Sequence, residues 1–415
     1  MAPQTFEFVP DRDSELFAAA PASAAVFVLR GEPGSEPYVS KTSNLRRRLQ
    51  RLLGLVEGQS RKLNLRDRVR TVEWVPVGSD FESSFVLHRT LRREFPRTYD
   101  QRLRLRFPPL IKLILDNPYP RATVTSRISG MRGKAQYFGP FPTRVAAEKF
   151  ANDALDLFKM RRCVDDLHPD PAFPGCIYSE MKMCLAPCFQ GCTDEQYAAE
   201  VERVQQFFQS GGESLVREIE RQRDDASANL DFEGAAALHT RLEKVKAAIS
   251  QRPEIVRRLE DLNGVLIQPS AEREAVALFK IAAGQICEPV TLVVGKQRLP
   301  HPPSPSSDEK GGSDLIARPQ SMESRITEAL AAAKPPNLRG ALERMEHLAL
   351  LKRWYYRTSK TGELFLTEAD GELPMRRVVR GVSRVFRGEK PAGDLSETAG
   401  DYWMFRAREA GIPDK

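Results

Sequence analysis

One short stretch combines an apolar pair with a lysine and three consecutive arginines. The stretch is "PYVSKTSNLRRRLQ", from Pro37 to Gln50. Lysine and arginine neutralise the charge on phosphate oxygens. These residue types fit a site that cleaves phosphodiesters or, without a metal, a surface that only holds phosphates. A solvated basic face remains the third interpretation.

Positive charge is concentrated around this stretch. The whole chain has 63 Lys and Arg against 56 Asp and Glu, a net charge of +7. Residues 41–106 alone contain 17 basic and 7 acidic residues, a local net charge of +10. Such an excess favours a polyanion partner, because each neutralised phosphate releases counterions. The expected phosphate contacts are Lys41, Arg46, Arg47, Arg48, Arg89, Arg92 and Arg93.

Five of the six cysteines lie within 30 residues and form a second candidate site. In an intracellular chain this clustering favours metal ligation over disulfides. Four thiolates can hold either a structural zinc or an iron–sulfur cluster, and spacing alone does not separate the two. Reduced thiols without a metal are the remaining alternative. The clustered residues are Cys163, Cys176, Cys184, Cys188 and a spare Cys192, whereas Cys287 has the apolar surroundings of a core residue.

Composition indicates a globular protein with several domains. The chain has 415 residues, of which 41% are hydrophobic and 29% charged. No run approaches the roughly 18 apolar residues that a membrane span needs. The segment "MAPQTFEFVPDRDSELFAAA" has no basic region ahead of an apolar block, so no signal peptide is predicted. We therefore expect a cytoplasmic protein of two to four domains with no membrane partner.

Two small α/β units are predicted to position these residues. In the first, "AAVFVLR", "PYVS" and "RTVEWVPV" predict strands, and "NLRRRLQRLLG" and "FESSFVLHRTLRREF" predict helices. In the second, "LIKLIL" and "RATVTSRI" predict strands, "QYFGPFPT" a turn, and "RVAAEKFANDALDLFKM" a helix. The cysteines follow in loop-rich sequence.

The remaining sequence predicts a helical hairpin and then an α+β region. Residues 194–250 have helical periodicity, with "NLDFEG" as a turn between two helices. Strands are expected in "NGVLIQP", "AVALFKIAAGQ", "CEPVTLVVG" and "GELFL", and "GALERMEHLALLKRWYYR" predicts a helix. The basic segment "MRRVVRGVSRVF" is interpreted as a strand, and residues 299–320 as a flexible linker. Trp354, Tyr355 and Tyr356 could be core residues or could stack on bases.

Four of these segments, in this order, resemble the UvrC family, the excinuclease subunit that incises DNA on either side of a lesion. "AAVFVL" with "YVSKTSNLRRRL" is similar to the GIY-YIG nuclease signature, and "YFGPFPTRVAAEKF" to the segment that follows that domain. The cysteine spacing resembles the family's cysteine-rich region, and "NLDFEGAAALHTRLEKVK" its UVR hairpin. The resemblance covers about residues 20–250 and implies four regions. They are a degenerate GIY-YIG-like domain at 1–106, a cysteine-rich middle domain at 107–193, a UVR hairpin region at 194–252, and a C-terminal region at 253–415 without a recognisable RNase H-like nuclease.

The resemblance also implies roles for single residues. Tyr38 and Arg48 stand at the positions of the catalytic tyrosine and arginine, and Lys41 at that of an active-site lysine. Cys163, Cys176, Cys184 and Cys188 would hold a [4Fe-4S] cluster, with zinc as the alternative. The hairpin would dock onto a UvrB-like protein through Leu230, Phe232, Ala235 and Leu238.

The chain departs from the family where the chemistry needs a metal. Phe27 and Ser40 replace the tyrosine and glycine of the two half-motifs, and Leu87 stands where a metal-binding glutamate is expected. Leucine cannot bind Mg²⁺ or Mn²⁺, which prefer oxygen ligands. Glu82 points to another side of the helix, and Glu94 lies about two turns further along, so neither fills the position.

Three functions follow from this pattern. The first is a UvrC-like DNA-binding protein of nucleotide excision repair, acting as an accessory or regulatory factor with an eroded nuclease centre. The alternative is an active endonuclease that nicks DNA beside lesions, in which another carboxylate restores Mg²⁺ or Mn²⁺ binding. The third is a metal-binding interaction module unrelated to repair.

Overall fold

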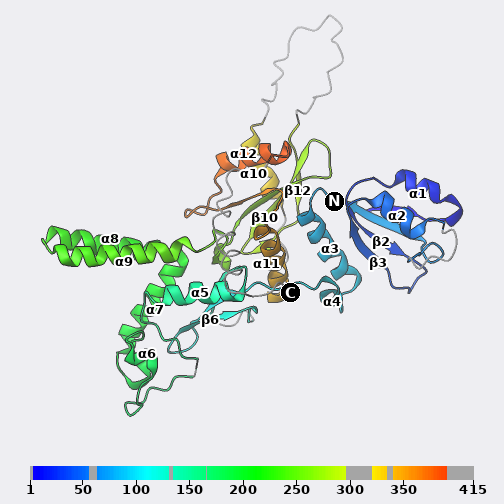
Figure 1. Cartoon of the computed structure of the whole chain (residues 1–415). Coiled ribbons are helices and arrows are strands. Elements are labelled where there is room, and N and C mark those ends of the chain that lie inside the picture. The colour runs from blue at the N-terminus through cyan, green and yellow to red at the C-terminus, as the bar shows by residue number, and fades with distance from the viewer. Residues whose placement is uncertain are drawn as a thin grey trace, which may run out of the picture.

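Three separate sheets and a projecting pair of helices make up the chain (Figure 1). The computed structural model describes residues 3–55, 63–129, 134–164, 166–295, 320–333 and 340–389. The expected α/β multidomain class is confirmed, with helices and antiparallel strands in every unit except the hairpin. The predicted linker lies, except for its last residue, outside the described residues. Within the described part, no helix combines the length and the apolarity that crossing a membrane requires.

The N-terminal unit is a four-stranded antiparallel sheet in the order β1-β4-β2-β3. Its strands are β1 (Gln4–Glu7), β2 (Ala25–Arg30), β3 (Tyr38–Thr42) and β4 (Thr71–Pro76). One face is covered by α1 (Asp13–Ala19), which follows the 3-10 turn η1 (Pro10–Arg12), and by α2 (Leu45–Leu53). Helix α2 begins where the Asn44 side chain accepts a hydrogen bond from the backbone N–H of Arg47, and it buries Leu45, Leu49, Leu52 and Leu53.

Helix α3 (Asp80–Glu94) belongs to two units at once. On one side Leu87 and Leu91 pack near Val39 of the edge strand β3, together with α4 (Tyr99–Leu103). On the other side Phe81 and Phe85 contact Phe279 in the C-terminal region, with ring centroids 5.1 and 5.7 Å apart. The N-terminal unit is therefore fixed to the C-terminal region through a buried helix.

The middle unit has a sheet in the order β6-β5-β7-β8. Its strands are β5 (Leu110–Ile114), β6 (Arg121–Thr125), β7 (Gln136–Gly139) and β8 (Arg257–Arg258). Helices α5 (Arg144–Leu155) and α7 (Asp194–Ser210) supply the apolar side chains that cover it. Since β8 follows the hairpin in sequence, the chain returns to complete this sheet. Between α5 and α7 lies a loop-rich lobe, in which the described residues form two short regular elements, α6 (Ile177–Glu180) and the 3-10 turn η2 (Pro187–Phe189).

Helices α8 (Glu213–Ala228) and α9 (Phe232–Ser250) form an arm that extends away from the rest of the protein (Figure 1). The predicted hairpin is confirmed, with a turn shorter than "NLDFEG" because α9 already begins at Phe232. The Asp231 side chain starts α9 by accepting a hydrogen bond from the N–H of Gly234 at 2.9 Å. All of its fully buried side chains lie near the base: Leu215, Ile219, Leu242, Val245 and Ala248.

The C-terminal region contains the third sheet, in the order β11-β10-β9-β13 with β12 also paired to β10. Its elements are η3 (Leu259–Asp261), β9 (Gly264–Pro269), β10 (Ala275–Ala282), β11 (Gln285–Ile286), β12 (Val290–Val293), α10 (Met322–Ala332), α11 (Ala341–Tyr355), β13 (Glu363–Leu366) and α12 (Met375–Phe386). Helices α10 and α12 cover one face, whereas α11 and α3 cover the other.

The prediction of a strand in "MRRVVRGVSRVF" is wrong, because the segment forms helix α12. Its valines favour strands by propensity, yet Val378, Val382 and Val385 are spaced four and three residues apart. That spacing puts them on one face of a helix, where they are buried against the sheet. Of the arginines between them, Arg380 is exposed and Arg384 pairs with Glu363 on β13. Tertiary packing here decides against local propensity.

Candidate nucleic-acid interface and cysteine-rich lobe

Tyr38 and Arg48 are in direct contact. Arg48 Nη2 donates a hydrogen bond to the Tyr38 hydroxyl at 2.9 Å. Tyr38 lies opposite Leu29 in the β2–β3 ladder, and residues opposite one another share a face, so its ring is on the α2 side of the sheet. Arg48 Nε is buried and has no hydrogen-bond partner among the described residues. Within the described residues, Arg48 therefore has one free N–H donor, at Nε, close to the Tyr38 hydroxyl.

Lys41 lies on the opposite face of the same strand. It pairs with Val26 in the ladder, and its Nζ donates to Asp80 Oδ1 at 2.9 Å and to Ser84 Oγ at 3.3 Å on α3. Partial burial opposes the charge on Asp80, but hydrogen bonds from Lys41 and Arg357 hold the pKa of this carboxyl below its ordinary value. The three residues expected to act together are thus divided between the two sides of β3.

Leu87 lies in an apolar cluster rather than in a polar centre. It packs with Leu91, Phe95 and Tyr99 near Val39. Across the described ranges, no group of three or more His, Cys, Asp and Glu side chains stands in an arrangement that could hold a metal ion. The residues around Leu87 do not fit a divalent cation.

Glu82 has a structural role at the start of α3. Its side chain is buried, and its Oε2 accepts a hydrogen bond from the N–H of Gly78 at 2.6 Å. Burial raises the pKa of this carboxyl above its ordinary value. The Ser79 hydroxyl accepts a hydrogen bond from the backbone N–H of Glu82. Ser79 and Glu82 therefore cap the N-terminus of α3.

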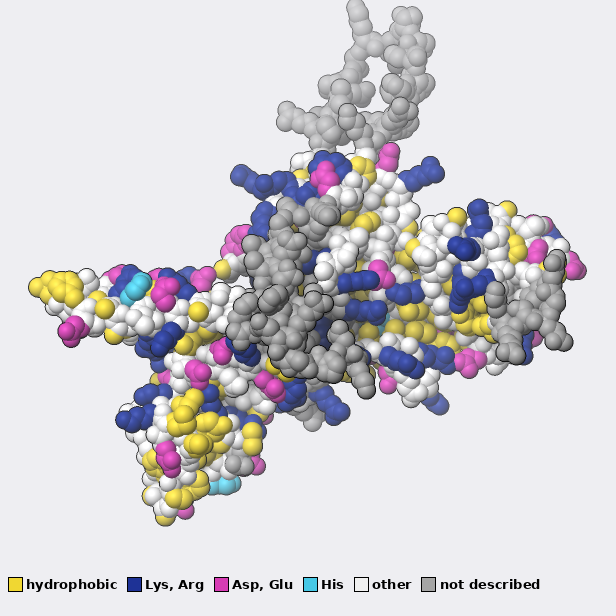
Figure 2. Space-filling model, viewed as in Figure 1, with side chains coloured by type: hydrophobic (Ala, Val, Ile, Leu, Met, Phe, Trp, Pro, Cys, Tyr) yellow, Lys and Arg dark blue, Asp and Glu magenta, His cyan; other side chains and the backbone are white. Residues whose placement is uncertain are grey.

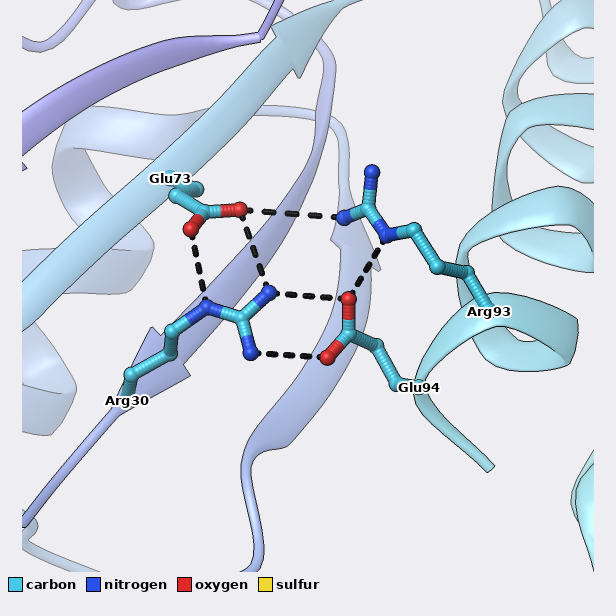
Figure 3. A network of polar contacts seen from close by, with 4 residues as sticks. All are labelled: Arg30, Glu73, Arg93 and Glu94. Carbon is cyan, nitrogen blue, oxygen red and sulfur yellow. Dashed lines mark hydrogen bonds and ion pairs between the residues drawn. The ribbon is translucent and has the colours of Figure 1, made fainter. Parts of the chain in front are cut away.

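Glu94 is held in a network of four charged side chains (Figure 3). Arg30 donates to both of its oxygens, at 2.7 and 2.8 Å, and Arg93 Nε adds a third hydrogen bond at 2.8 Å. Arg30 also binds Glu73 on β4 through Nε at 2.8 Å. The hydrogen bond from Arg30 lowers the pKa of Glu94. This network joins β2, β4 and α3, and leaves Glu94 engaged in the fold.

The arginines of α3 that were expected to contact phosphates form ion pairs within the protein. Arg89 pairs with Glu288, Arg92 with Glu343 at 2.7 Å, and Arg93 with Glu94. Each of these pairs would have to open, or share its arginine, for a phosphate to bind. Their assignment to DNA contact stays a prediction.

The basic residues of α2 differ from one another. Arg46 Nε donates to the Ala20 carbonyl at 2.9 Å, which fixes the end of α1. Arg47 is exposed, and its guanidinium has no partner within the described residues. Arg47 is therefore the α2 arginine best placed to reach a phosphate.

A buried polar cluster joins α3 and α4 to α11, and nothing in the sequence predicted it. Glu346 accepts hydrogen bonds from His88 Nε2 at 2.9 Å and from the Tyr99 hydroxyl at 2.7 Å, with Arg92 3.8 Å away. Burial opposes ionisation of Glu346, but the hydrogen bonds from His88 and Tyr99 lower its pKa. His347 beside it accepts from the N–H of Ile286, and burial lowers its pKa to about 3. The cluster keeps a carboxylate charged in the core between two units.

The four cysteines expected to bind a cluster lie together in the lobe around α6. Burial raises the pKa of the Cys184 thiol to about 11, with further contributions from Cys163, Cys188 and Cys176. Two donors point at sulfur: Arg161 Nη1 toward Cys163 at 3.4 Å and the N–H of Ala186 toward Cys184 at 3.3 Å. The described side chains are not in ligating geometry. Four thiols in one lobe, two of them with N–H donors to sulfur, nevertheless fit the chemistry of a thiolate-held group. Cys192 is also half-buried there, and Cys287 is a core residue as predicted.

The tip of the α8–α9 arm is apolar and exposed. Leu230 is 74% and Phe232 66% exposed, whereas Ala235 and Leu238 are half-buried between the helices. Figure 2 shows this end of the arm covered by hydrophobic side chains. The hairpin thus presents two large apolar residues far from the core that supports it.

Two models of known protein families match this chain, one over the middle unit and one over the α8–α9 arm. Residues 109–207 match the UvrC/Cho excinuclease middle domain, and residues 213–248 match the UvrB/uvrC motif. Two regions of this chain are thus similar to known regions of UvrC proteins. They follow each other in the order expected from the sequence, and the first includes the five clustered cysteines.

The chain is also similar to curated UvrABC system protein C sequences. The UvrABC system protein C of Methanothermobacter thermautotrophicus is 25% identical over 268 residues, which is 64% of this chain and 44% of the relative. That of Gemmatimonas aurantiaca is 28% identical over 301 residues, covering 72% and 47%. The chain thus spans less than half the length of these curated relatives. No solved structure matches it significantly.

Proposed function

We propose that this chain is a DNA-binding protein of nucleotide excision repair that acts as an accessory or regulatory factor and does not cleave DNA. The observation that carries the proposal is the half-buried Leu87 at the position expected of a metal-binding glutamate. The two neighbouring carboxylates are engaged elsewhere, Glu82 in closing α3 and Glu94 in the network with Arg30. Tyr38 and Arg48 are in contact and could supply a proton acceptor and a cation. Without a bound metal these two groups are not sufficient for the proposed type of DNA cleavage.

The first test is a nicking assay. We expect no Mg²⁺- or Mn²⁺-dependent nicks in a lesion-bearing duplex, because Leu87 supplies no oxygen ligand. The measurement is conversion of a labelled strand, with the Tyr38→Phe and Arg48→Ala variants run beside the wild-type protein. Nicking by the wild type that both substitutions abolish would overturn the proposal.

If the chain is instead an active endonuclease, Asp80 is the carboxylate best suited to replace the missing metal ligand. It lies seven residues before Leu87, about two turns along the same side of α3. Its side chain is half exposed and its pKa is lowered by Lys41 and Arg357, so it is ionised at neutral pH. Loss of nicking in Asp80→Asn as well would identify this carboxylate as the replacement ligand.

The cysteine-rich lobe is proposed to hold a [4Fe-4S] cluster, with zinc as the alternative. Cys163, Cys176, Cys184 and Cys188 would be the ligands, and the N–H groups that point at Cys163 and Cys184 would stabilise thiolate charge. Such a group would order the lobe rather than take part in chemistry on DNA.

The arm is proposed to dock onto a UvrB-like partner through its apolar tip. Replacing Leu230 and Phe232 together by serine is expected to abolish binding to that partner, because these two side chains supply the exposed apolar area. The melting temperature should stay unchanged, since neither residue is buried. Co-elution with a purified UvrB-like protein measures the effect.

A matched control for the arm is the exposed polar residue His239 on the same helix. The His239→Ser variant should bind as the wild type does. Unchanged binding by the double variant would remove the tip from the proposed interface.

A further inference from the structure

Five basic side chains come from β3, from the segment before β5 and from the end of α11. We call them the basic seam; they are Lys41, Arg106, Lys352, Arg353 and Arg357. Two belong to the first 106 residues, and three to the end of α11 and the residue just after its cap. Figure 2 shows Lys and Arg side chains over α3 and α4.

One carboxylate holds the two parts of the seam together. Asp80 accepts from Lys41 Nζ at 2.9 Å and from Arg357 Nη1 at 2.5 Å. Lys41 and Arg357 come from units far apart in sequence, so their cations converge only when α3 is docked on the C-terminal region. Asp80 carries a single negative charge, which leaves this junction positive.

The other three cations have no acidic partner among the described residues. Arg106, Lys352 and Arg353 form no side-chain hydrogen bond or ion pair within the described ranges. Burial and the nearby charge of Arg106 lower the pKa of Lys352, so two like charges lie close together. A bound anion would relieve this repulsion.

The three aromatic residues at the end of α11 are not free to stack on single-stranded bases. Tyr355 is half-buried, with its ring centroid 5.0 Å from that of Tyr356. Trp354 is buried, and its indole Nε1 donates to the Thr361 carbonyl at 2.9 Å. The hydroxyl of Tyr356 donates to the Pro140 carbonyl at 2.9 Å. Both rings are therefore part of the core, and the seam offers only charge, which suits a regular array of phosphates.

We propose that the basic seam binds the phosphate backbone of duplex DNA and that the C-terminal region supplies half of this site. The inference rests on the DNA-binding role proposed above and adds to it a surface outside the regions that match known families. Duplex DNA bound there contacts both the N-terminal unit and α11. Binding consequently stabilises the docking of the two.

The test compares two double variants with equal loss of charge. Arg106→Gln with Arg353→Gln removes two seam cations that make no contact whose loss would disturb folding. The control, Arg376→Gln with Arg377→Gln, removes two exposed arginines from α12, on the other side of the C-terminal sheet. Affinity for a fluorescent, non-specific DNA duplex is measured by anisotropy over a series of salt concentrations, after thermal melting has verified that each variant is folded.

Each lost phosphate contact reduces the slope of log affinity against log salt by about 0.9. We expect the seam variant to lower the slope by roughly two such contacts and to bind more weakly, while the control keeps the wild-type slope. An unchanged slope in the seam variant, or an equal change in the control, overturns the seam and leaves the DNA-binding role standing. If the wild-type protein shows no salt-dependent binding to duplex DNA, the proposed DNA-binding role fails and the seam with it.

Discussion

Replacing Glu346 by alanine is expected to lower the free energy of unfolding by about 3 to 5 kcal/mol, the usual cost of breaking a buried charged pair. Glu346 is 2% exposed and accepts from both His88 and Tyr99. Without it, two buried donors lose their acceptor, and His88 Nδ1 already has no partner among the described residues. Urea denaturation followed by tryptophan fluorescence measures the loss, since Trp354 lies on the same helix.

The matched control is Glu343→Ala, one turn earlier on α11. Glu343 pairs with Arg92 in a partly exposed position, and such a pair contributes at most about 1 kcal/mol. A Glu346→Ala variant no less stable than Glu343→Ala would contradict the assignment of Glu346 as the anchor of α3.

The stability difference between the wild type and Glu346→Ala is expected to depend on pH. Because the folded-state pKa of Glu346 is lowered, its stabilising contribution is fully present above the unfolded value near 4.5. It is lost as pH falls through the folded pKa, so the difference between wild type and Glu346→Ala should shrink in acid. A difference that grows on acidification would mean that the pKa of this carboxyl is raised, not lowered, in the folded protein.

Local patterns in the sequence were sufficient to predict most elements of the fold. The alternation of β4 and the capped apolar stripe of α2 are complete within their own segments, so they could be identified without the rest of the chain. Strand β1 was not predicted, although Phe6 and Phe8 alternate with polar residues, because four residues at a terminus are a weak signal. Helix α12 was assigned wrongly because valine propensity was weighted above spacing.

Contacts between distant segments were outside the reach of the sequence. His88 and Glu346 are 258 residues apart, and each alone is consistent with an exposed helical position. The same holds for Asp80 and Arg357, which are 277 residues apart. A single sequence contains no information on which helices will meet, so both the buried cluster and the basic seam appear only in the folded structure.

The site residues were predicted to differing degrees. Tyr38 and Arg48 were expected to act together and do lie in contact, since the β3–α2 connection is local. Lys41 was grouped with them by the family resemblance, yet strand alternation places it on the other side of β3. The α3 arginines looked like a phosphate surface, but their acidic partners lie on other elements, except for Glu94 beside Arg93, and could not be matched by reading one segment.

Helix α3 is packed on two sides. Its β3-facing side carries Leu87 into an apolar cluster, and its other side carries Phe81, Phe85 and His88 into the C-terminal core. A helix docked in this way suits the proposed scaffold, in which one DNA-binding surface is composed from two units.

The other large effect is expected in the cysteine-rich lobe, where Cys184→Ser should abolish the proposed cluster. Between α5 and α7 the described chain has only the four-residue helix α6 and one 3-10 turn, so little backbone hydrogen bonding stabilises this lobe. A metal group held by four thiolates would then provide most of its folding energy, on the order of 10 kcal/mol for comparable metal sites. Cys184 is the most buried of the four thiols by its raised pKa of about 11, and serine is a poor ligand for iron and zinc.

The measurements for this variant are iron, sulfide and zinc content after anaerobic purification, the visible absorption band of an iron–sulfur cluster, and limited proteolysis of the lobe. Wild-type protein should contain iron and sulfide and resist cleavage, whereas Cys184→Ser should lack both and be cut between α5 and α7. Cys192→Ser is the matched control, because this fifth thiol is half-buried in the same lobe and is not needed as a ligand. Zinc in place of iron would favour the alternative metal, and wild-type protein without either would refute a metal-held lobe. Iron and zinc would have different consequences. An iron–sulfur cluster would make the lobe sensitive to oxidants, whereas a zinc ion would have a purely structural role.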